Sequence, residues 1–517
     1  MGVLVVRGGE VHDGLGSPAV HADVVLTDGR VNAVGGGVPS GAEVLNATGK
    51  VVCPGFVDIH THSDLTVLSN GLGPSKIRQG VTTEVVGNCG LGMAPLGETA
   101  DLDELRPAAA YLDVDPAVTI GWRDQRGYLD ALAGAGLGLN VGALAAHIPI
   151  RGSVLGLGDT APSAADLDAM CGLLGAALDA GALGLSTGLV YAPLCYAPPE
   201  ELRRLAEVVA ERGKLFAWHV RDYGDDLLES VTQALEVTRA TGVRTQISHL
   251  VSVGRRNWGS VRKTLDLVDA ANASGFDVGV DVYPYTAGNA PLAQLLPPWV
   301  QDGGTDAMRE RLHDDAVRAE VLDHFGGNPL GWDEIAVCAV PPDGDHSLVG
   351  RFISDLGGDG NQAALELLAT YGGAVMMVAY GRDEGDVRAV LDHPAAVVAS
   401  DGQALDPDGP TGAGRPHPRS YGTFPRYLSR YADDLADGIR RCTSAPADRV
   451  GLTDRGRLVP GAAADLLVLD PATLADTATF TEPARFPTGV DAVVVNGRLT
   501  LDHGRDLGVR AGSVLTA

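Results

Sequence analysis

Short apolar runs alternate with longer amphipathic stretches through the middle of the chain. This pattern is typical of βα units, in which buried parallel strands alternate with helices. Segments such as Pro199–Arg212 and Trp258–Ala273 have the period of an amphipathic helix. The eight runs that predict strands are Phe56–His62, Gly80–Asn88, Leu139–His147, Ala182–Gly188, Lys214–Val220, Arg244–Leu250, Asp277–Tyr285 and Ala396–Gly402. Eight strands with helical connections predict an α/β fold of the (β/α)8 TIM-barrel type.

Both ends of the chain carry a different pattern, in which short β-like runs are separated by Gly and Asp turns. It covers residues 1–55 and returns over residues 450–517. Neither piece has enough apolar surface to fold alone, so we expect them to form one small β-sandwich domain beside a barrel of residues 56–449. About 100 residues separate the seventh and eighth predicted strands. We interpret residues 287–350 as an inserted, lid-like segment over the barrel mouth.

The composition narrows the class of protein. The chain has 517 residues, of which 45% are hydrophobic and 20% charged, as in ordinary globular proteins. Its net charge of −27 repels nucleic acid and anionic membranes. The sequence shows neither a signal peptide nor a bilayer-spanning apolar run, and its six cysteines have no paired framework. We expect a cytoplasmic protein that acts on a small molecule, with its oligomeric state open, a homo-oligomer included.

Residue types that bind metals stand where the predicted strands end. They are His60, His62, Cys89, His219, His249 and Asp401. In a barrel of this type the active site lies at the carboxyl ends of the strands, and imidazole and thiolate groups are zinc ligands. Each residue alone has a simpler interpretation, such as a buried apolar cysteine, a core histidine or an aspartate that begins a turn. Their joint placement at one rim predicts a metal site.

The motifs around these residues resemble the amidohydrolase superfamily, in particular its D-aminoacylase (N-acyl-D-amino-acid deacylase) branch. The resemblance covers nearly the whole chain, and its motifs are Pro54–His62, Gln79–Thr83, Gly87–Gly90, Gly184–Tyr191, Tyr283–Gly288 and His417–Arg426. Many relatives with two metals bridge them with a carboxylated lysine on the fourth strand. The run Ala182–Gly188 has no lysine here. The resemblance implies that a thiolate from Cys89 can take the bridging role instead, and sulfur favours zinc.

The resemblance implies a zinc-dependent amide hydrolase that converts an N-acyl-D-amino acid into a D-amino acid and a carboxylate. It implies a tight zinc site and a second, weaker site whose occupancy is left open. The tight site comprises Cys89, His219 and His249, and the weaker one His60, His62 and Cys89. Zinc would polarise the scissile carbonyl and activate water. Asp401 would accept the water's proton as general base and pass it to the leaving amine as general acid.

The α-carboxylate of such a substrate requires a fixed cation. The resemblance makes Arg419 the first candidate, and the hydroxyl groups of Tyr191 and Tyr283 are candidates to donate hydrogen bonds to the same carboxylate. For both tyrosines, packing is the simpler interpretation. His147 and Arg221 are predicted to lie near the mouth, where each also has an ordinary structural interpretation.

Two positions depart from the family pattern. The family has His and Lys directly after the sixth-strand ligand, where this chain has Leu250 and Val251, and a serine of the family is replaced by Asn289. This chain therefore offers fewer groups to bind the substrate carboxylate than the family pattern does. The alternative substrate is a cyclic amide or imide, or an acylated amine of a specialised pathway that lacks a simple α-carboxylate. A non-catalytic binding protein is a third hypothesis, which the metal-binding residues at the strand ends disfavour.

Overall fold

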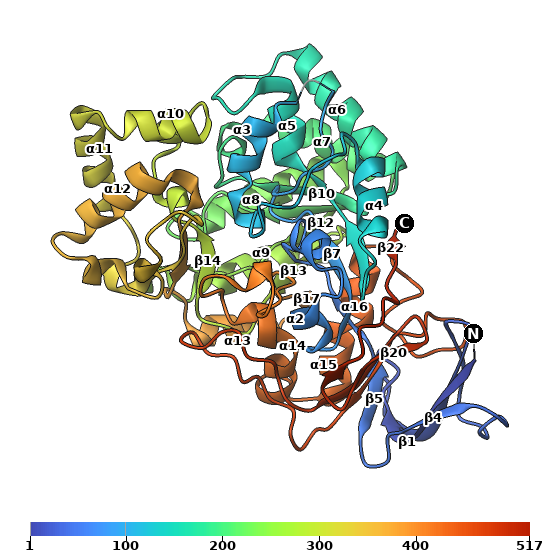
Figure 1. The fold of residues 1–517 in the computed structure, drawn as a ribbon. Coiled ribbons are helices and arrows are strands. Elements are labelled where there is room, and N and C mark those ends of the chain that lie inside the picture. The colour runs from blue at the N-terminus through green and yellow to red at the C-terminus, as the bar shows by residue number, and fades with distance from the viewer. Residues whose placement is uncertain (1, 99, 517) are drawn as a thin grey trace.

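The computed structural model describes residues 2–98 and 100–516 (Figure 1). Each of the eight apolar runs contains a strand, and the third run is divided in two by Leu144. The strands are β6 (Phe56–Asp58), β7 (Val81–Val86), β8 (Asn140–Ala143), β9 (Ala145–Ala146), β10 (Gly184–Gly188), β11 (Leu215–His219), β12 (Arg244–Ile247), β13 (Val278–Val282) and β17 (Ala396–Val398). Nearly all of their residues are buried on both faces, which explains the continuous apolar runs.

These strands are parallel and neighbour one another in chain order. One sheet runs β6-β7-β8-β22, where β22 (Val514–Leu515) comes from the C-terminal end, and the other runs β9-β10-β11-β12-β13-β17. A parallel bridge joins Thr61, after β6, to Gly402, after β17. The carboxyl ends of the first and last strands of the series therefore lie side by side.

Helices follow most of the parallel strands (Figure 1). Those between β6 and β13 are α1 (Thr66–Ser69), α2 (Pro74–Ile77), α3 (Leu102–Ala108), α4 (Gln125–Gly134), α5 (His147–Leu155), α6 (Ala164–Asp179), α7 (Pro199–Glu211), α8 (Leu227–Thr241) and α9 (Ser260–Ala273). Around and after β17 lie α13 (Glu384–Leu391), α14 (Arg419–Arg430), α15 (Leu435–Cys442) and α16 (Ser444–Arg449). Among the described residues, no helix has the length and apolar character that crossing a bilayer requires.

Helix α7 shows why the amphipathic stretches fold as they do. It begins with Pro199, whose fixed φ suits the first helical position, and it carries Glu200 and Glu201 in its first turn, where acidic groups favour a helix. Its buried apolar residues, spaced three or four apart, are Leu202, Leu205, Ala206 and Val209. That face packs against β11 and against the neighbouring helices α6 and α8.

Both ends of the chain contribute to one nine-stranded sheet. Its strands are β1 (Val3–Val11), β2 (Val20–Thr27), β3 (Arg30–Val34), β4 (Glu43–Asn46), β5 (Val51–Pro54), β18 (Leu466–Leu469), β19 (Val490–Val495), β20 (Arg498–Asp502) and β21 (Arg505–Asp506). The two ends meet where β5 pairs antiparallel with β18. Because all nine strands belong to one hydrogen-bonded network, the pairing does not confirm a sandwich of two facing sheets.

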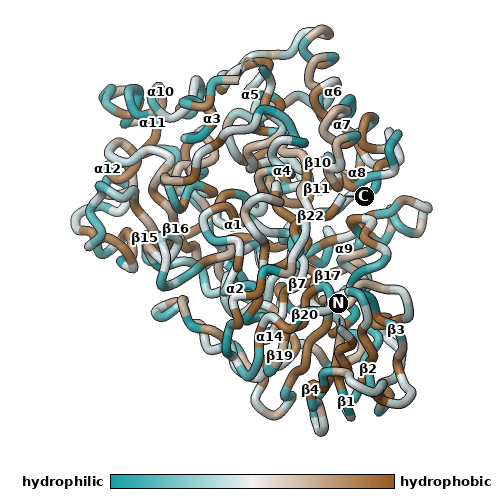
Figure 2. Tube along the Cα trace, turned by 45° about the vertical axis from the view of Figure 1, so that its right-hand side comes forward, coloured by the Kyte–Doolittle hydropathy of each residue, from teal (hydrophilic) through white to brown (hydrophobic). Residues whose placement is uncertain are grey.

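A segment between β13 and β17 forms a layer with its own core. It contains an antiparallel sheet in the order β14-β16-β15, with β14 (Gly288–Pro291), β15 (Ile335–Ala339) and β16 (Met376–Ala379), and the helices α10 (Gly304–Arg311), α11 (Asp315–Phe325) and α12 (Gly360–Tyr371). In Figure 1 these helices extend to the left, and Figure 2 shows α10 and α11 as largely hydrophilic. The segment extends to residue 379, beyond residue 350, because the apolar face of α12 packs into this separate core.

A fully buried ion pair ties the first strand to the last. The Nζ atom of Lys76 lies 2.8 Å from Asp58 Oδ2 and 2.8 Å from Ser400 Oγ, and Asp58 Oδ1 accepts a hydrogen bond from the Ser400 backbone N–H at 2.9 Å. Both side chains of the pair are completely buried. Ser400 directly precedes Asp401, so this contact sets the position of the turn that carries Asp401.

We predict that Lys76→Met lowers the free energy of unfolding by about 3–5 kcal/mol, because it leaves a buried carboxylate without its partner. The measurement is the change in urea midpoint and slope. The control is Arg30→Met, which removes an ion pair to Asp454 that is about half exposed on both sides. That control should cost less than about 1 kcal/mol. Equal small effects of both substitutions would contradict the prediction.

Candidate metal centre and active site

The structure brings the six side chains that were predicted to bind metal together at the carboxyl ends of the parallel strands. His60 and His62 follow β6, Cys89 follows β7, His219 ends β11, His249 follows β12 and Asp401 follows β17. Two groups of ligand atoms, each mutually within 4.8 Å, comprise His60, His62, Cys89 and Asp401, and Cys89, His219 and His249. Cys89 belongs to both groups.

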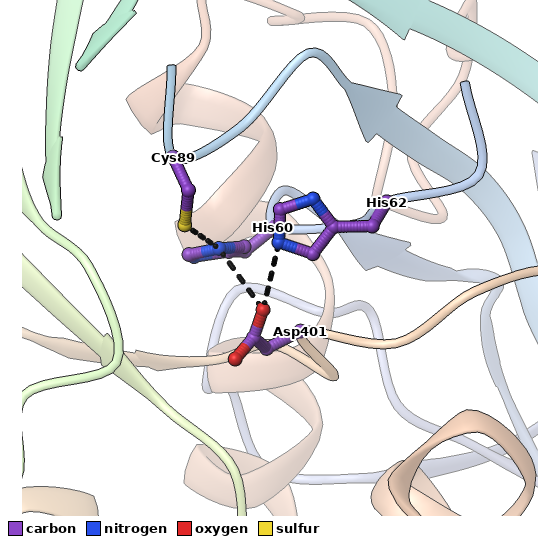
Figure 3. A group of neighbouring side chains, drawn as sticks. All are labelled: His60, His62, Cys89 and Asp401. Carbon is purple, nitrogen blue, oxygen red and sulfur yellow. Dashed lines mark hydrogen bonds and ion pairs between the residues drawn. The ribbon is translucent and has the colours of Figure 1, made fainter. Parts of the chain in front are cut away.

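The distances within the first group fit a small cation (Figure 3). The Sγ atom of Cys89 lies 3.2 Å from His60 Nε2, and Asp401 Oδ1 lies 3.3 Å from His60 Nε2 and 3.0 Å from His62 Nε2. On its other side Cys89 Sγ lies 3.5 Å from His249 Nε2. The Nδ1 atom of His219, in the second group, is buried without a hydrogen-bond partner. A buried nitrogen without a partner, in a group with a thiol, fits a metal-binding role.

Three of the six residues have a left-handed backbone, with φ of 55° at Cys89, 33° at His249 and 51° at Asp401. This conformation is uncommon for residues other than glycine, and strain of this kind often occurs at functional sites. At each position the chain leaves a strand and turns sharply. The neighbouring Gly188 leaves room for this, because a Cβ there would overlap the carbonyl oxygen of Cys89.

Burial sets the charge of three histidines of the site. It lowers the pKa of His62 to about 4 and of His219 to about 3, and it lowers the pKa of His249 well below the ordinary value. These three imidazoles are therefore neutral near pH 7, which is the form that binds a metal.

The charges of Asp401 and His60 are set by their neighbours. Burial opposes ionisation of Asp401, but Arg419 and His60 outweigh it and hold the pKa of Asp401 well below its usual range. Burial also lowers the pKa of His60, yet the neighbouring Cys89, Asp281 and Asp401 outweigh it and raise that pKa well above the ordinary value. Burial raises the pKa of the Cys89 thiol to about 11. A bound divalent cation reverses this effect, because it favours the thiolate.

Asp281, on β13, is a site residue that the sequence analysis missed. Its Oδ1 accepts hydrogen bonds from His60 Nδ1 at 2.9 Å and from the His249 backbone N–H at 2.8 Å, and its Oδ2 accepts one from Gln246 Nε2 at 3.0 Å. Asp281 therefore holds His60 in the tautomer whose Nε2 faces Cys89 and Asp401. The feature of the sequence that could have identified Asp281 is the presence of a carboxylate inside the apolar run Val278–Val282.

The metal-binding residues open into a cavity of about 380 Å³. Of the residues expected to contact substrate, four line this cavity, namely Tyr191, Arg221, Tyr283 and Asn289. Arg221 donates its guanidinium hydrogens to the carbonyls of Cys195 and Ala197 and to the Gln233 side chain. The Nδ2 atom of Asn289 donates to the Met377 carbonyl at 2.8 Å.

His147 and Arg419 are not among the cavity-lining residues. His147 is hydrogen-bonded through both ring nitrogens, to Thr187 and Glu201, each at 2.9 Å. Arg419 is buried, with Nη1 2.7 Å from Asp401 Oδ2 and Nη2 3.0 Å from the Tyr111 hydroxyl. In this structure Arg419 is therefore ion-paired with Asp401. Arg382, which the sequence analysis missed, lines the cavity together with Arg221.

Comparisons with known proteins agree with this geometry. An N-acyl-D-glutamate deacylase of Alcaligenes xylosoxydans xylosoxydans is 36% identical over 503 residues, which cover 96% of this chain and 92% of that protein. A D-aminoacylase of the same organism is 33% identical over 525 residues, covering 99% and 97%. The crystal structure of an N-acyl-D-glutamate deacylase from Bordetella bronchiseptica, with zinc and a phosphonate inhibitor that mimics the tetrahedral intermediate, matches with a TM-score of 0.83 and 34% identity over 99% of each chain.

The chain belongs to the amidohydrolase family, which it matches over residues 43–501. The resemblance to the D-aminoacylase branch is confirmed by these relatives. Family membership and the buried ligand groups together define a metal-dependent hydrolase of amide bonds with an α/β amidohydrolase fold.

We predict that Cys89→Ala lowers the metal content at least about tenfold, because Cys89 supplies the one atom that both ligand groups share. Metal per chain is measured by inductively coupled plasma mass spectrometry after dialysis against a weak chelator. The matched control is Cys442→Ala, an equally buried cysteine outside both ligand groups. An unchanged metal content in Cys89→Ala would show that the metal binds elsewhere.

Proposed function

We propose that this protein deacylates N-acyl-D-amino acids, releasing a D-amino acid and a carboxylate. The observation that carries the proposal is the position of Cys89 Sγ, which is shared by two ligand groups, one of which contains the ionised Asp401. Two relatives, an N-acyl-D-glutamate deacylase and a D-aminoacylase, support this substrate class. The phosphonate bound to the related deacylase supports hydrolysis through a tetrahedral intermediate.

For the metal, we propose zinc held by Cys89, His219 and His249, with a weaker second site formed by His60, His62 and Cys89. The Cys89 thiol and the neutral imidazoles of His219 and His249 are a donor set that zinc prefers, and the related deacylase was crystallised with zinc. When bound, the metal supplies a Lewis acid for the scissile carbonyl and makes a water molecule more acidic.

Asp401 is the group that moves the proton in this proposal. As a carboxylate it accepts a proton from the attacking water while the new C–O bond forms at the carbonyl carbon. It then delivers the proton to the amide nitrogen, so that the C–N bond breaks and a neutral amine leaves. Arg419 keeps Asp401 ionised and fixes its orientation through the 2.7 Å contact. Asp281 positions His60 beside it.

We also propose that the parallel strands close into a (β/α)8 barrel over residues 56–449, with the sheet formed by residues 1–55 and 450–517 as a small domain. The chain-order pairing and the Thr61–Gly402 bridge support closure. The inserted segment would act as a lid, because both its residues and the strand-end ligands line the cavity. A cytoplasmic location and a homo-oligomer stay predictions of the sequence.

One observation favours a second class of substrate. Val251 lines the cavity near His249, where the family pattern has a lysine, so this wall offers no positive charge to an α-carboxylate. A cyclic amide or imide, or an acylated amine without a carboxylate, would not need that charge. Hydrolysis of a hydantoin faster than that of an acylated D-amino acid would favour this alternative.

We expect zinc-loaded protein to release amine from N-acetyl-D-leucine, to act much more slowly on the L enantiomer, and to lose activity when a strong chelator removes the metal. Asp401→Asn should lower kcat by roughly 10²–10⁴, because the proton carrier is lost. Asp408→Asn, a nearby exposed aspartate, is the control. Amine release is followed with a colorimetric reagent. The proposal fails if no acylated amino acid is hydrolysed, or if Asp401→Asn with normal zinc content keeps full activity.

A further inference from the structure

Arg382, between β16 and α13, presents an uncommitted positive charge to the cavity. Its Nη1 donates a hydrogen bond to the Tyr283 hydroxyl, and its guanidinium carbon lies 4.8 Å from the centre of the Tyr283 ring. Among the described residues, no carboxylate forms an ion pair with the Arg382 guanidinium, and its side-chain hydrogen bond is the one to Tyr283. A half-buried guanidinium without an anion next to it is a natural binding group for a carboxylate.

The other arginines near the site are already engaged. Arg221 lines the cavity, but hydrogen bonds to two backbone carbonyls and to Gln233 occupy its guanidinium. Arg419 is ion-paired with Asp401 and does not line the cavity, although its Nε atom has no hydrogen-bond partner. A substrate carboxylate that enters the cavity therefore meets Arg382, which lines the cavity and has no anionic partner among the described residues.

The backbone around Arg382 is built to hold this side chain against the cavity. The Arg382 backbone N–H donates to the Thr286 carbonyl at 3.3 Å, which links the loop to the end of β13. A Cβ at position 288 would overlap Nη2 of Arg382, so Gly288 provides the space that the guanidinium occupies. The ring of Tyr283 also contacts the Arg419 guanidinium, at 4.6 Å, which places Arg382 beside the Arg419–Asp401 pair.

The apolar residues that line the cavity come mostly from the inserted segment. They are Val253, Leu295, Phe325, Pro329, Leu330 and Met377, called here the apolar end, and the uncharged Gln294 and Asn328 of the same segment also line the cavity. The ionisable residue of the inserted helices that borders this end is His324, which lies on the exposed face of α11. A second carboxylate placed there would lose water without gaining a fixed counter-charge.

We infer that Arg382, together with the Tyr283 hydroxyl, binds the single carboxylate of the substrate, and that the apolar end accepts an uncharged side chain. This inference rests on the proposed deacylase function and specifies its substrate class as N-acyl amino acids with neutral, apolar side chains. Two donors side by side, one of them charged, match the two oxygens of a carboxylate. The apolar wall selects against an acidic side chain such as that of glutamate.

The test compares zinc-loaded wild type with Arg382→Met and Arg382→Lys, using N-acetyl-D-leucine, N-acetyl-D-glutamate and N-acetyl-D-leucinamide, which lacks the carboxylate. We expect wild type to hydrolyse the leucine substrate with a kcat/KM at least about tenfold above that for glutamate. Arg382→Met should raise KM for N-acetyl-D-leucine by roughly 10- to 150-fold, as expected for loss of a charge-assisted hydrogen bond. The same substitution should change kcat/KM for hydrolysis of the acetyl group of N-acetyl-D-leucinamide by no more than about twofold, because that substrate makes no such bond.

Two further variants separate binding from structure. Arg382→Lys should restore part of the affinity, since it keeps the charge and loses the planar fork. Arg255→Met is the matched control, because Arg255 also belongs to this side of the molecule but has a side chain 74% exposed and pairs with Glu334 outside the cavity. Zinc content and thermal midpoint are measured for every variant.

The outcomes are distinct. An equal loss of activity in Arg382→Met toward the acid and the leucinamide would make Arg382 a structural residue and overturn its binding role. A wild-type preference for N-acetyl-D-glutamate would overturn the assignment of the apolar end. Absence of amine release from every substrate by zinc-loaded wild type would instead refute the proposed function on which the inference rests.

Discussion

The proposed active site depends on one atom, the sulfur of Cys89. Candidate ligand atoms from four other strand ends lie within 4.8 Å of it. Residues separated by more than 300 positions in the chain reach this point because parallel strands present their carboxyl ends at one edge. The buried Lys76–Asp58–Ser400 contact fixes the first and last strands relative to each other, directly beneath Asp401. The left-handed turns at Cys89, His249 and Asp401 then direct the side chains inward.

The charges of the site form a consistent set around this sulfur. Burial keeps His62, His219 and His249 neutral, while Arg419 keeps Asp401 ionised. The carboxylates of Asp401 and Asp281 make the site favourable for a cation. The separate inserted layer brings apolar residues to the outer part of the cavity. The cavity is therefore lined both by residues at the strand ends and by residues of the inserted segment.

Much of this arrangement was predictable from local sequence patterns. Buried parallel strands produce continuous apolar runs, so all eight were located, and a His-x-His pair at a strand end predicted where the metal-binding residues would meet. The family resemblance was confirmed. The individual roles of the ligands and of Asp401 stay predictions. Asp281 was missed because a carboxylate in a strand gives no local indication of the histidine it will contact.

Other features depend on distances that sequence patterns do not contain. The family resemblance suggested a substrate contact for Arg419, but only the folded chain shows that Arg419 forms an ion pair with Asp401. Arg382 lies in an unremarkable loop and gains its significance from the cavity that forms around it. The sequence pattern did not assign α12 and β16 to the inserted segment, because they have ordinary helix and strand patterns. No local signal indicates which core these elements join.

The most direct test of the central claim is anomalous X-ray diffraction at the zinc edge from crystals of the zinc-loaded protein. The account predicts a peak about 2.3 Å from Cys89 Sγ, with nitrogen atoms of His219 and His249 at about 2.0–2.1 Å. A zinc peak bound to other residues, or no peak near Cys89 in catalytically active crystals, would contradict it.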